Sequence, residues 1–550
     1  MRVDPRGRGA GVWGALPAAG LFLILIAQGT AQPPPGKPGD ESVDLRAPEK
    51  PRVLLDTALP SLSGRSVTVP AGGDLQNALN AAVPGDTLVL EAGAVFRGPF
   101  TLPKKPGSGW IVIRSSAVGP GFPAVGTRVG PSDAPRMPKL EAASGSVVEA
   151  ARGAHHYRFI GIEMRPREGT FLYNLVLLGS EESSADQQPH DIVFDRCYLH
   201  GDPRKGTRRG IALNSRSTAV VDSHLSDFKE VGADSQAIGG WNGGGPFKIV
   251  NNRLEGAGEN VMFGGAPTFI DRLVPSDIEI RGNYFYKPLA WKAGDPAYAG
   301  TPWSVKNLFE LKNARRVLVE GNLFENNWAA AQNGFAVLFT VRTVGDSTPW
   351  AVVEDVSFAR NVVRRATSGV NILGLDDGSP TKSGRTRFVS ISHNLFVDVG
   401  EPGRQGAGVF VQVLDGAAGV TVEHNTALHS GSILVADMSP SRGLVFRDNI
   451  VEQNEYGVFG SGKGIGLPAL EHYFPGYVFR RNVIVGGDPR AYPPDNFFPK
   501  TLDAVGFTDL QGGTYLLSGK SAYRRKGTDG TDVGADVAGL RGAGGAGGTP

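Results

Sequence analysis

The sequence contains little cysteine, little net charge and no apolar run of membrane-spanning length. A single cysteine, Cys197, allows no internal disulfide and no thiolate cluster for zinc or iron–sulfur chemistry. Lysine and arginine number 56 against 54 aspartates and glutamates, a net charge of +2, so the chain lacks the basic field typical of nucleic-acid-binding proteins. Its most apolar run is shorter than the about 20 residues that a membrane helix needs. We therefore expect neither a nucleic-acid partner nor a membrane span in the mature chain.

Glycine and proline are abundant instead, with 77 and 39 of 550 residues. With a hydrophobic content of 40%, this composition is typical of many short strands separated by turns rather than of a helical enzyme. A chain of this length can form one large repetitive domain, so internal repeats decide its architecture.

The first residues have the order of an export signal. Arginines precede an apolar run at 21–26, and the small residues Gly29 and Ala31 then offer a cleavage site. We expect residues 1–31 to be a signal peptide, so that the protein is secreted, periplasmic or on the cell surface. An uncleaved membrane anchor is the competing interpretation.

Two further segments have a composition that cannot pack a core. Residues 32–51 are typical of a Pro-rich linker and residues 541–550 of a Gly-rich tail, and both are predicted to be disordered. Residues 52–540 remain for one folded domain.

One short pattern recurs between about residues 157 and 485: two apolar residues spaced by two, a break, usually an Asn, and another apolar residue. Examples are FKIVNNRL, IEIRGNYF, VLVEGNLF and VSISHNLF. The recurring residues are Asn252, Asn283, Asn322, Asn361, Asn394, Asn425, Asn449 and Asn482, which lie 24 to 39 residues apart. The spacing predicts a solenoid of coils with stacked Asn turns, in which Cys197 and Ser223 occupy the same position. Leucine-rich repeats and β-propellers would require signatures that the chain lacks.

The segment before these repeats predicts a cap. Residues 72–96 indicate an amphipathic helix over 75–82, the only helix expected, followed by a Pro-Gly turn and a strand. This block resembles the N-terminal cap of the pectate-lyase-like superfamily, and the run at 527–536 resembles the segment that closes such domains. The resemblance implies an all-β fold, a right-handed parallel β-helix with an N-terminal cap helix.

The outer faces of such a fold suit a long polymer, because outward side chains repeat at about 4.8 Å per coil. Five of the seven tryptophans fall between residues 241 and 350. Loop tryptophans can stack on the apolar faces of sugar rings. We expect Trp241 and Trp303 to contact a polysaccharide, and the chain to be a monomer.

Strand alternation in the same stretch predicts an outward polar patch. In NLFELK, ending at Lys312, the Phe and the second Leu point inward, so the Glu and the Lys point outward; AVLFTVR, ending at Arg342, alternates likewise. The expected patch consists of Glu259, Asn260, Glu310, Lys312, Thr340, Arg342 and Asn371. Within it we expect Glu310, Asn260 and Asn371 to bind substrate.

The segments FELKNARRVLVEGNLFENN and GFAVLFTVR resemble the Lys and Arg coils of the alginate lyase and chondroitinase B family. The resemblance implies that Lys312 is the catalytic base, that Arg342 assists it, and that calcium held by Asn and Glu neutralises a substrate carboxylate. The candidate metal ligands are Glu259, Asn260 and Glu310. The two glutamates that precede the Lys in this family are replaced here by Val305 and Asn307.

Two other pairs carry weaker signals. Asp376 and Asp377 are similar to the paired acids of polygalacturonase-like hydrolases, although the other signatures of that family are missing. His393 and His424 precede the recurring Asn in adjacent coils, where stacking would give a two-ligand metal site. No third ligand is identifiable, so the sequence favours histidines that only line the turns.

Three functions follow from these patterns. The first is a lyase that cleaves an anionic, uronic-acid-containing polysaccharide by β-elimination, in which Arg342 lowers the pKa of Lys312 so that this amine acts as base. The second is a non-catalytic surface protein that binds carbohydrate or has a structural role. The third is a glycoside hydrolase.

Overall fold

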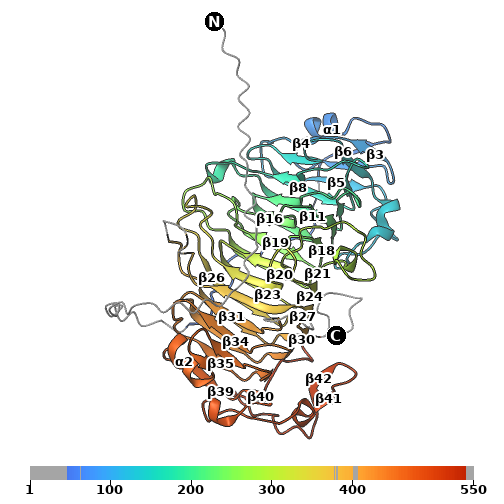
Figure 1. Ribbon diagram of the computed structural model, residues 1–550. Coiled ribbons are helices and arrows are strands. Elements are labelled where there is room, and N and C mark those ends of the chain that lie inside the picture. The colour runs from blue at the N-terminus through green and yellow to red at the C-terminus, as the bar shows by residue number, and fades with distance from the viewer. Residues whose placement is uncertain (1–45, 62, 377, 379–381, 401–406, 541–550) are drawn as a thin grey trace. The chain divides into compact units, whose positions relative to one another are not determined.

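The structure is a computed structural model that describes residues 46–61, 63–376, 378, 382–400 and 407–540 (Figure 1). These residues belong to one compact unit. The predicted signal peptide, linker residues 32–45 and the Gly-rich tail lie outside the described residues.

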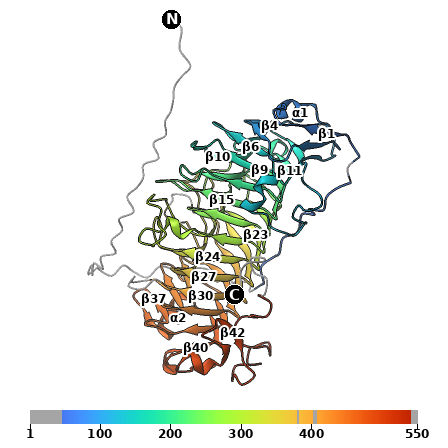
Figure 2. The same ribbon diagram turned by 90° about the vertical axis from the view of Figure 1, so that its right-hand side faces the viewer.

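Three long sheets form the body of the chain. Sheet A has 14 strands, from β1 (Ser66–Val69) to β39 (Val478–Arg480), and sheet B has 13, from β3 (Val95–Arg97) to β40 (Val483–Val485). Sheet C has 13 strands, from β4 (Phe100–Leu102) to β38 (Gly464–Ile465). Through most of each sheet the neighbouring strands are three apart in sequence order and parallel, so that each coil gives one strand to each sheet, and Figure 2 shows the coils stacked in chain order. The predicted right-handed parallel β-helix is confirmed.

The recurring asparagines form a buried ladder at the turn from sheet A to sheet B. Asn283 is typical: its backbone N–H and its Nδ2 both donate to Oδ1 of Asn322, at 2.9 and 3.0 Å, and Nδ2 also donates to the carbonyl of Ile249. Ser223 and Cys197 extend the ladder towards the N-terminus, as predicted, and Asn496 extends it beyond the last predicted member. The buried polar groups of each turn thereby find hydrogen-bond partners in the next coil.

Apolar side chains fill the interior between the sheets. Phenylalanines from successive coils stack along the axis, with ring centroids 5.3 Å apart for Phe159 and Phe194 and 4.3 Å for Phe285 and Phe324. A side chain that points inward therefore packs against its counterpart in the next coil, which makes the alternation of each strand decisive for what faces solvent.

The N-terminal cap is the predicted helix, α1 (Leu75–Ala81). The carboxylate of Asp74 accepts from the N–H of Asn77, and Leu75 and Leu79 are buried against the first coil. A second helix, α2 (Leu467–Tyr473), packs on β37 (Val458–Gly460), so the expectation of a single helix is wrong. Among the described residues no helix is long and apolar enough to cross a membrane.

Both terminal segments fold back along the β-helix. Residues 46–61 lie on sheet A, where Leu55 packs on Val193 and Val221, and the closing segment lies on sheet B, where Leu540 packs on Leu323 and Leu395. Residues 46–51 of the predicted linker contact the β-helix: the backbone N–H of Glu49 donates to the carboxylate of Asp355. Because these contacts are with sheets A and B, they do not cover the outer face of sheet C.

Candidate active site

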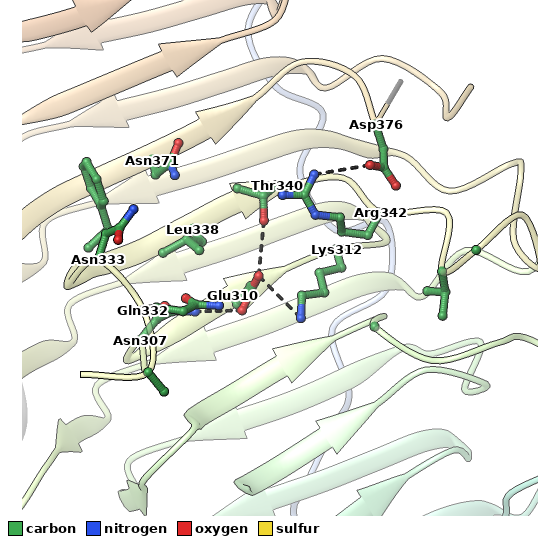
Figure 3. Close-up of a pocket in the computed structure, with 15 residues that line it drawn as sticks. Asn307, Glu310, Lys312, Gln332, Asn333, Leu338, Thr340, Arg342, Asn371 and Asp376 are labelled. Atoms are coloured by element: carbon green, nitrogen blue, oxygen red, sulfur yellow. Dashed lines mark hydrogen bonds and ion pairs between the residues drawn. The ribbon is translucent and has the colours of Figure 1, made fainter. Parts of the chain in front are cut away.

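A cleft of about 560 Å³ opens on the outer face of sheet C. Its floor is formed by β22 (Phe309–Leu311), β25 (Phe335–Thr340) and β28 (Ser368–Leu373) and by the residues that follow these strands. The polar lining residues are Asn307, Glu310, Lys312, Gln332, Asn333, Thr340, Arg342, Asn371 and Asp376 (Figure 3). Five residues of the predicted patch thus lie together: Glu310, Lys312, Thr340, Arg342 and Asn371.

Alternation within the strands explains why these side chains face outward. Phe309 and Leu311 of β22 are fully buried in the core, which turns Glu310 to the opposite face. Lys312 follows directly after β22, and its carbonyl accepts from the N–H of Arg342 in the next coil at 3.0 Å. Lys312 and Arg342 are therefore neighbours along the axis.

Glu310 is the centre of the polar network. Its Oε2 accepts from Nδ2 of Asn307 at 2.7 Å, and its Oε1 accepts from the hydroxyl of Thr340 at 3.2 Å. The ammonium of Lys312 lies 3.6 Å from the same Oε1 (Figure 3). With only 2% of its surface exposed, this carboxylate is held in one orientation between three donors.

Asp376 joins the site from the loop after β28. Its Oδ1 lies 3.4 Å from the guanidinium of Arg342, and its Oδ2 accepts from the N–H and the hydroxyl of Thr343. Asp377, the other member of the predicted acid pair, lies outside the described residues. From its loop, Asp376 orients the Arg342 side chain beside the cleft.

The charges around Lys312 raise its pKa, whereas the sequence predicted a lowered pKa. Burial lowers the pKa of this ammonium, and so does Arg342, but the carboxylates of Glu310 and Glu259 outweigh both and raise the pKa above its usual value. The prediction of a lowered pKa is therefore wrong for the site as it stands, because the ion pair with Glu310 had not been foreseen.

Asn260 does not face the cleft. The side chain is fully buried and donates to the carbonyls of Leu254 and Tyr286, while its Oδ1 accepts from the ammonium of Lys287 at 3.2 Å. This corrects its prediction as an outward substrate or metal ligand. Regular alternation fails at the start of β19 (Glu259–Phe263), where the N–H groups of residues 260 and 261 both point to one carbonyl, that of Leu308.

The predicted tryptophans also lie elsewhere. Trp303 is 9% exposed and packs with Trp291 and Trp328 in an apolar cluster. Trp241 is partly buried, with the guanidinium of Arg209 5.0 Å from its ring centroid. Neither ring lines the cleft, so the structure does not bring these tryptophans together with Lys312 and Arg342.

Several oxygen atoms near Glu310 suit a hard cation. Oδ1 of Asn307 and Oε1 of Glu259 are buried and accept from none of the described groups. Calcium prefers such carboxylate and amide oxygens. Asn307, which stands where the resemblance expects a glutamate, thus replaces Asn260 among the candidate ligands. Asn371 also has an orphan Oδ1, but it lies two coils from Glu310 and about 10 Å away, too far to share one ion.

Glu259 is the second carboxylate among the candidate calcium ligands near Glu310. Its Oε2 accepts from Nε2 of Gln236 at 2.7 Å, and the ammonium of Lys306 lies 3.8 Å from its Oε1. Burial, reinforced by the charge of Asp234, raises the pKa of Glu259 to about 7. At neutral pH this side chain can therefore gain or lose a proton.

Comparison with known proteins gives a likeness of fold. No protein-family model and no curated protein matches the sequence. Among solved structures, the chain is similar to an alginate lyase from Paenibacillus (12% identity, 79% of this chain and 99% of that one, TM-score 0.28). It is also similar to a GH87 α-1,3-glucanase from Streptomyces thermodiastaticus (12%, 80% and 71%, 0.48) and to a PL6 family alginate lyase (12%, 85% and 58%, 0.42). These names describe those proteins and assign no activity to this one.

Proposed function

We propose that the chain is an exported polysaccharide lyase that cleaves a uronic-acid-containing polymer by β-elimination in the cleft of sheet C. The observation that carries the proposal is the placement of Lys312 and Arg342 in adjacent coils, both lining one open cleft beside the buried carboxylate of Glu310. An amine and a guanidinium so placed can serve as a base and as a partner for a substrate carboxylate.

β-Elimination requires three events at one sugar. The proton at C5 is removed, the C4–O bond of the glycosidic link breaks with its electron pair going to the leaving oxygen, and a C4–C5 double bond forms. The amine of Lys312 takes up the C5 proton, and the leaving oxygen takes a proton from water. Arg342, oriented by Asp376, pairs with the uronate carboxylate as it gains enolate character, which a planar guanidinium does better than an ammonium.

Glu310 controls whether Lys312 can act. While its negative charge is uncompensated, it keeps Lys312 protonated. Balancing that charge removes the largest of the effects that raise the pKa of Lys312. Burial and Arg342 then lower this pKa towards that of a working base against only the smaller contributions of Glu259 and Asp234. Asn307, Glu310 and Glu259 have the oxygen atoms to hold calcium, which when bound supplies this balance and neutralises the substrate carboxylate.

The position of the cleft favours a polymeric substrate. It spans β22, β25 and β28, and outward side chains repeat about every 4.8 Å across such coils. An extended chain can therefore lie along several coils, with one uronate between Lys312 and Arg342. The expected substrate is an anionic polysaccharide. Export of the protein from the cell is proposed from the predicted signal peptide.

The test is incubation of the mature protein with alginate, pectate and chondroitin, with calcium or with chelator, read by ultraviolet absorbance of the unsaturated product. We expect absorbance to rise with one polymer class and Lys312→Ala to lose that activity. The matched control is Lys463→Ala, which removes an exposed lysine outside the cleft.

Other outcomes would point to the two alternative functions. New reducing ends without unsaturated product would favour a hydrolase, for which Glu310 and Asp376 are the carboxylates of the cleft. Binding of polymer without any new chain ends would favour a non-catalytic protein. Wild-type turnover by Lys312→Ala would contradict the assignment of the base.

A further inference from the structure

A row of residues with left-handed backbone runs along sheet A, near the start of its strands. It includes His156 of β8 (His155–Ile160), Asp191 of β11 (His190–Asp195) and Ser217 of β14 (Arg216–Val221), with φ values of 60, 52 and 46°. Farther along, Asp277 and Asp355 occupy the same row. Equivalent backbone positions in successive coils bring these side chains next to one another.

Acids in the later part of the row are neutralised by arginine. Asp277 pairs with Arg316 at 2.7 Å, and Asp355 pairs with Arg46 of the N-terminal segment at 2.5 Å. These contacts give the row a structural role there, since they join adjacent coils and fasten residues 46–52 to the sheet.

The first two coils of the row carry imidazoles instead. Nδ1 of His190 lies 2.6 Å from Oδ2 of Asp191, and Nδ1 of His156 lies 4.0 Å from the same oxygen. A fourth group, Nδ1 of His155, lies 2.8 Å from Nδ1 of His156, and the His155 ring stacks on that of His190 with centroids 4.8 Å apart. Two adjacent coils thus direct nitrogen and oxygen donors to one point.

The donor set has the chemistry of a zinc-type site. Ligand atoms of His156, His190 and Asp191 lie within 4.8 Å of one another. A tetrahedral ion bound at about 2.0 to 2.1 Å needs its ligands about 3.3 Å apart, which modest side-chain rotations can provide. The side chains are 18%, 25% and 34% exposed, so an ion can reach them from solvent.

We propose that His156, His190 and Asp191 bind a divalent transition-metal ion of the zinc class, which joins β8 to β11. Imidazole nitrogen favours such ions over calcium, whose ligands are oxygen atoms. The site is on sheet A, near the N-terminal end of the β-helix (Figure 1), whereas the cleft is on sheet C, so the ion is structural and independent of the proposed lyase chemistry.

The test uses the mature protein without a histidine tag, freed of metal by a chelator and titrated with zinc chloride in a calorimeter. We expect one zinc per chain, a higher melting temperature with zinc, and no competition from excess calcium. Substitution of a residue that only hydrogen-bonds to a metal ligand weakens metal binding by roughly 10- to 100-fold. His156→Ala and Asp191→Asn each change a ligand itself and should weaken zinc binding by at least as much. The control Ser217→Ala alters the same row one coil farther on and should bind like the wild type.

A second readout follows the ion at the site itself. The ring of Trp110 meets that of His156 edge to face, with centroids 5.3 Å apart. Copper(II), a paramagnetic ion that the same ligands would accept, should therefore quench a part of the tryptophan fluorescence that Trp110→Phe removes. This readout applies even if His156→Ala folds poorly, because Trp110→Phe leaves every proposed ligand in place.

Three results would overturn the proposal. One is the absence of saturable zinc binding by the wild type. Another is unchanged binding after the double substitution of His156 and His190 by Ala. The third is loss of binding in His424→Ala, because His424 stacks on His393 in the same geometry and faces Asp448 and Asp529, which makes that pair the competing site.

Discussion

The carboxylate of Glu310 makes the largest of the contributions that raise the pKa of the proposed base, Lys312. It accepts hydrogen bonds from Asn307 and Thr340 and holds the ammonium of Lys312 at 3.6 Å. A favourable charge partner raises the pKa of an amine, so removing the charge must lower it. Substitution of Glu310 therefore tests the electrostatics directly, through the pKa of Lys312 and separately from any activity.

Glu310→Gln should lower the pKa of Lys312 in the absence of calcium. The amide keeps the size of the side chain but removes the largest contribution that raises the pKa, so burial and Arg342 then act against only Glu259 and Asp234. The measurement is an NMR titration of reductively ¹³C-methylated protein, with the Lys312 signal assigned by its loss in Lys312→Ala. An unchanged or higher pKa would show that Glu310 is not the dominant partner.

Glu259→Gln should stabilise the protein at pH 8 and have little effect at pH 5. A carboxyl whose folded-state pKa is raised to about 7 loses stability as pH rises from its unfolded value of about 4.3 through 7, because the unfolded state ionises first. Gln mimics the protonated form, so the gain at pH 8 is roughly 1 to 3 kcal/mol. Urea unfolding of both proteins at the two pH values measures it, and equal stability at pH 8 would contradict the raised pKa.

At the scale of single elements, the Asn ladder carries much of the turn stability. Oδ1 of Asn361 accepts two bonds from Asn322, while its own N–H and Nδ2 donate to Asn394 and its Nδ2 also to the carbonyl of Val319. All of these groups are buried, so none regains a partner when one rung is removed.

Asn361→Leu should therefore destabilise the fold by about 3 kcal/mol or more. The control Ser390→Ala lies on β29 (Arg387–Ser392) of the same coil stack and faces outward, where a small polar side chain contributes little. Denaturant unfolding of both variants checks the prediction. If Asn361→Leu unfolds at the wild-type midpoint, its turn does not depend on the ladder.

The elements also show what sequence could and could not predict. Side chains alternate between the two faces of a strand, and this alternation was enough to place Glu310 outward on β22. Any other register would bury Glu310 in the phenylalanine stack. The same rule failed for Asn260, since a strand that starts at a corner breaks the alternation. It could not place Trp303 or Asp376, whose positions depend on how loops pack, and loop packing has no period.

At the scale of the whole molecule, the two ends of the described chain leave one face for function. Residues 46–61 contact sheet A, and the segment ending at Leu540 contacts sheet B. Linker-like composition did not reveal this for residues 46–51, because the N-terminal segment is held partly by carboxylates of the β-helix itself, including Asp277 and Asp355. The cleft on sheet C should therefore work independently of the N-terminal segment.

Leu55→Ala should loosen that segment without affecting the cleft. Leu55 packs on Val193 and Val221, and partial loss of this contact costs about 1 kcal/mol, which corresponds to roughly fivefold more frequent local opening. Trypsin should then cut after Arg52 about fivefold faster, as followed by mass spectrometry. The control Leu54→Ala removes a neighbouring leucine that is 54% exposed and should be cut like the wild type. An unchanged rate for Leu55→Ala would show that the hydrogen bonds to Asp277 and Asp355 alone hold the segment, and altered turnover of a polymer substrate would show that sheet A and the cleft are coupled.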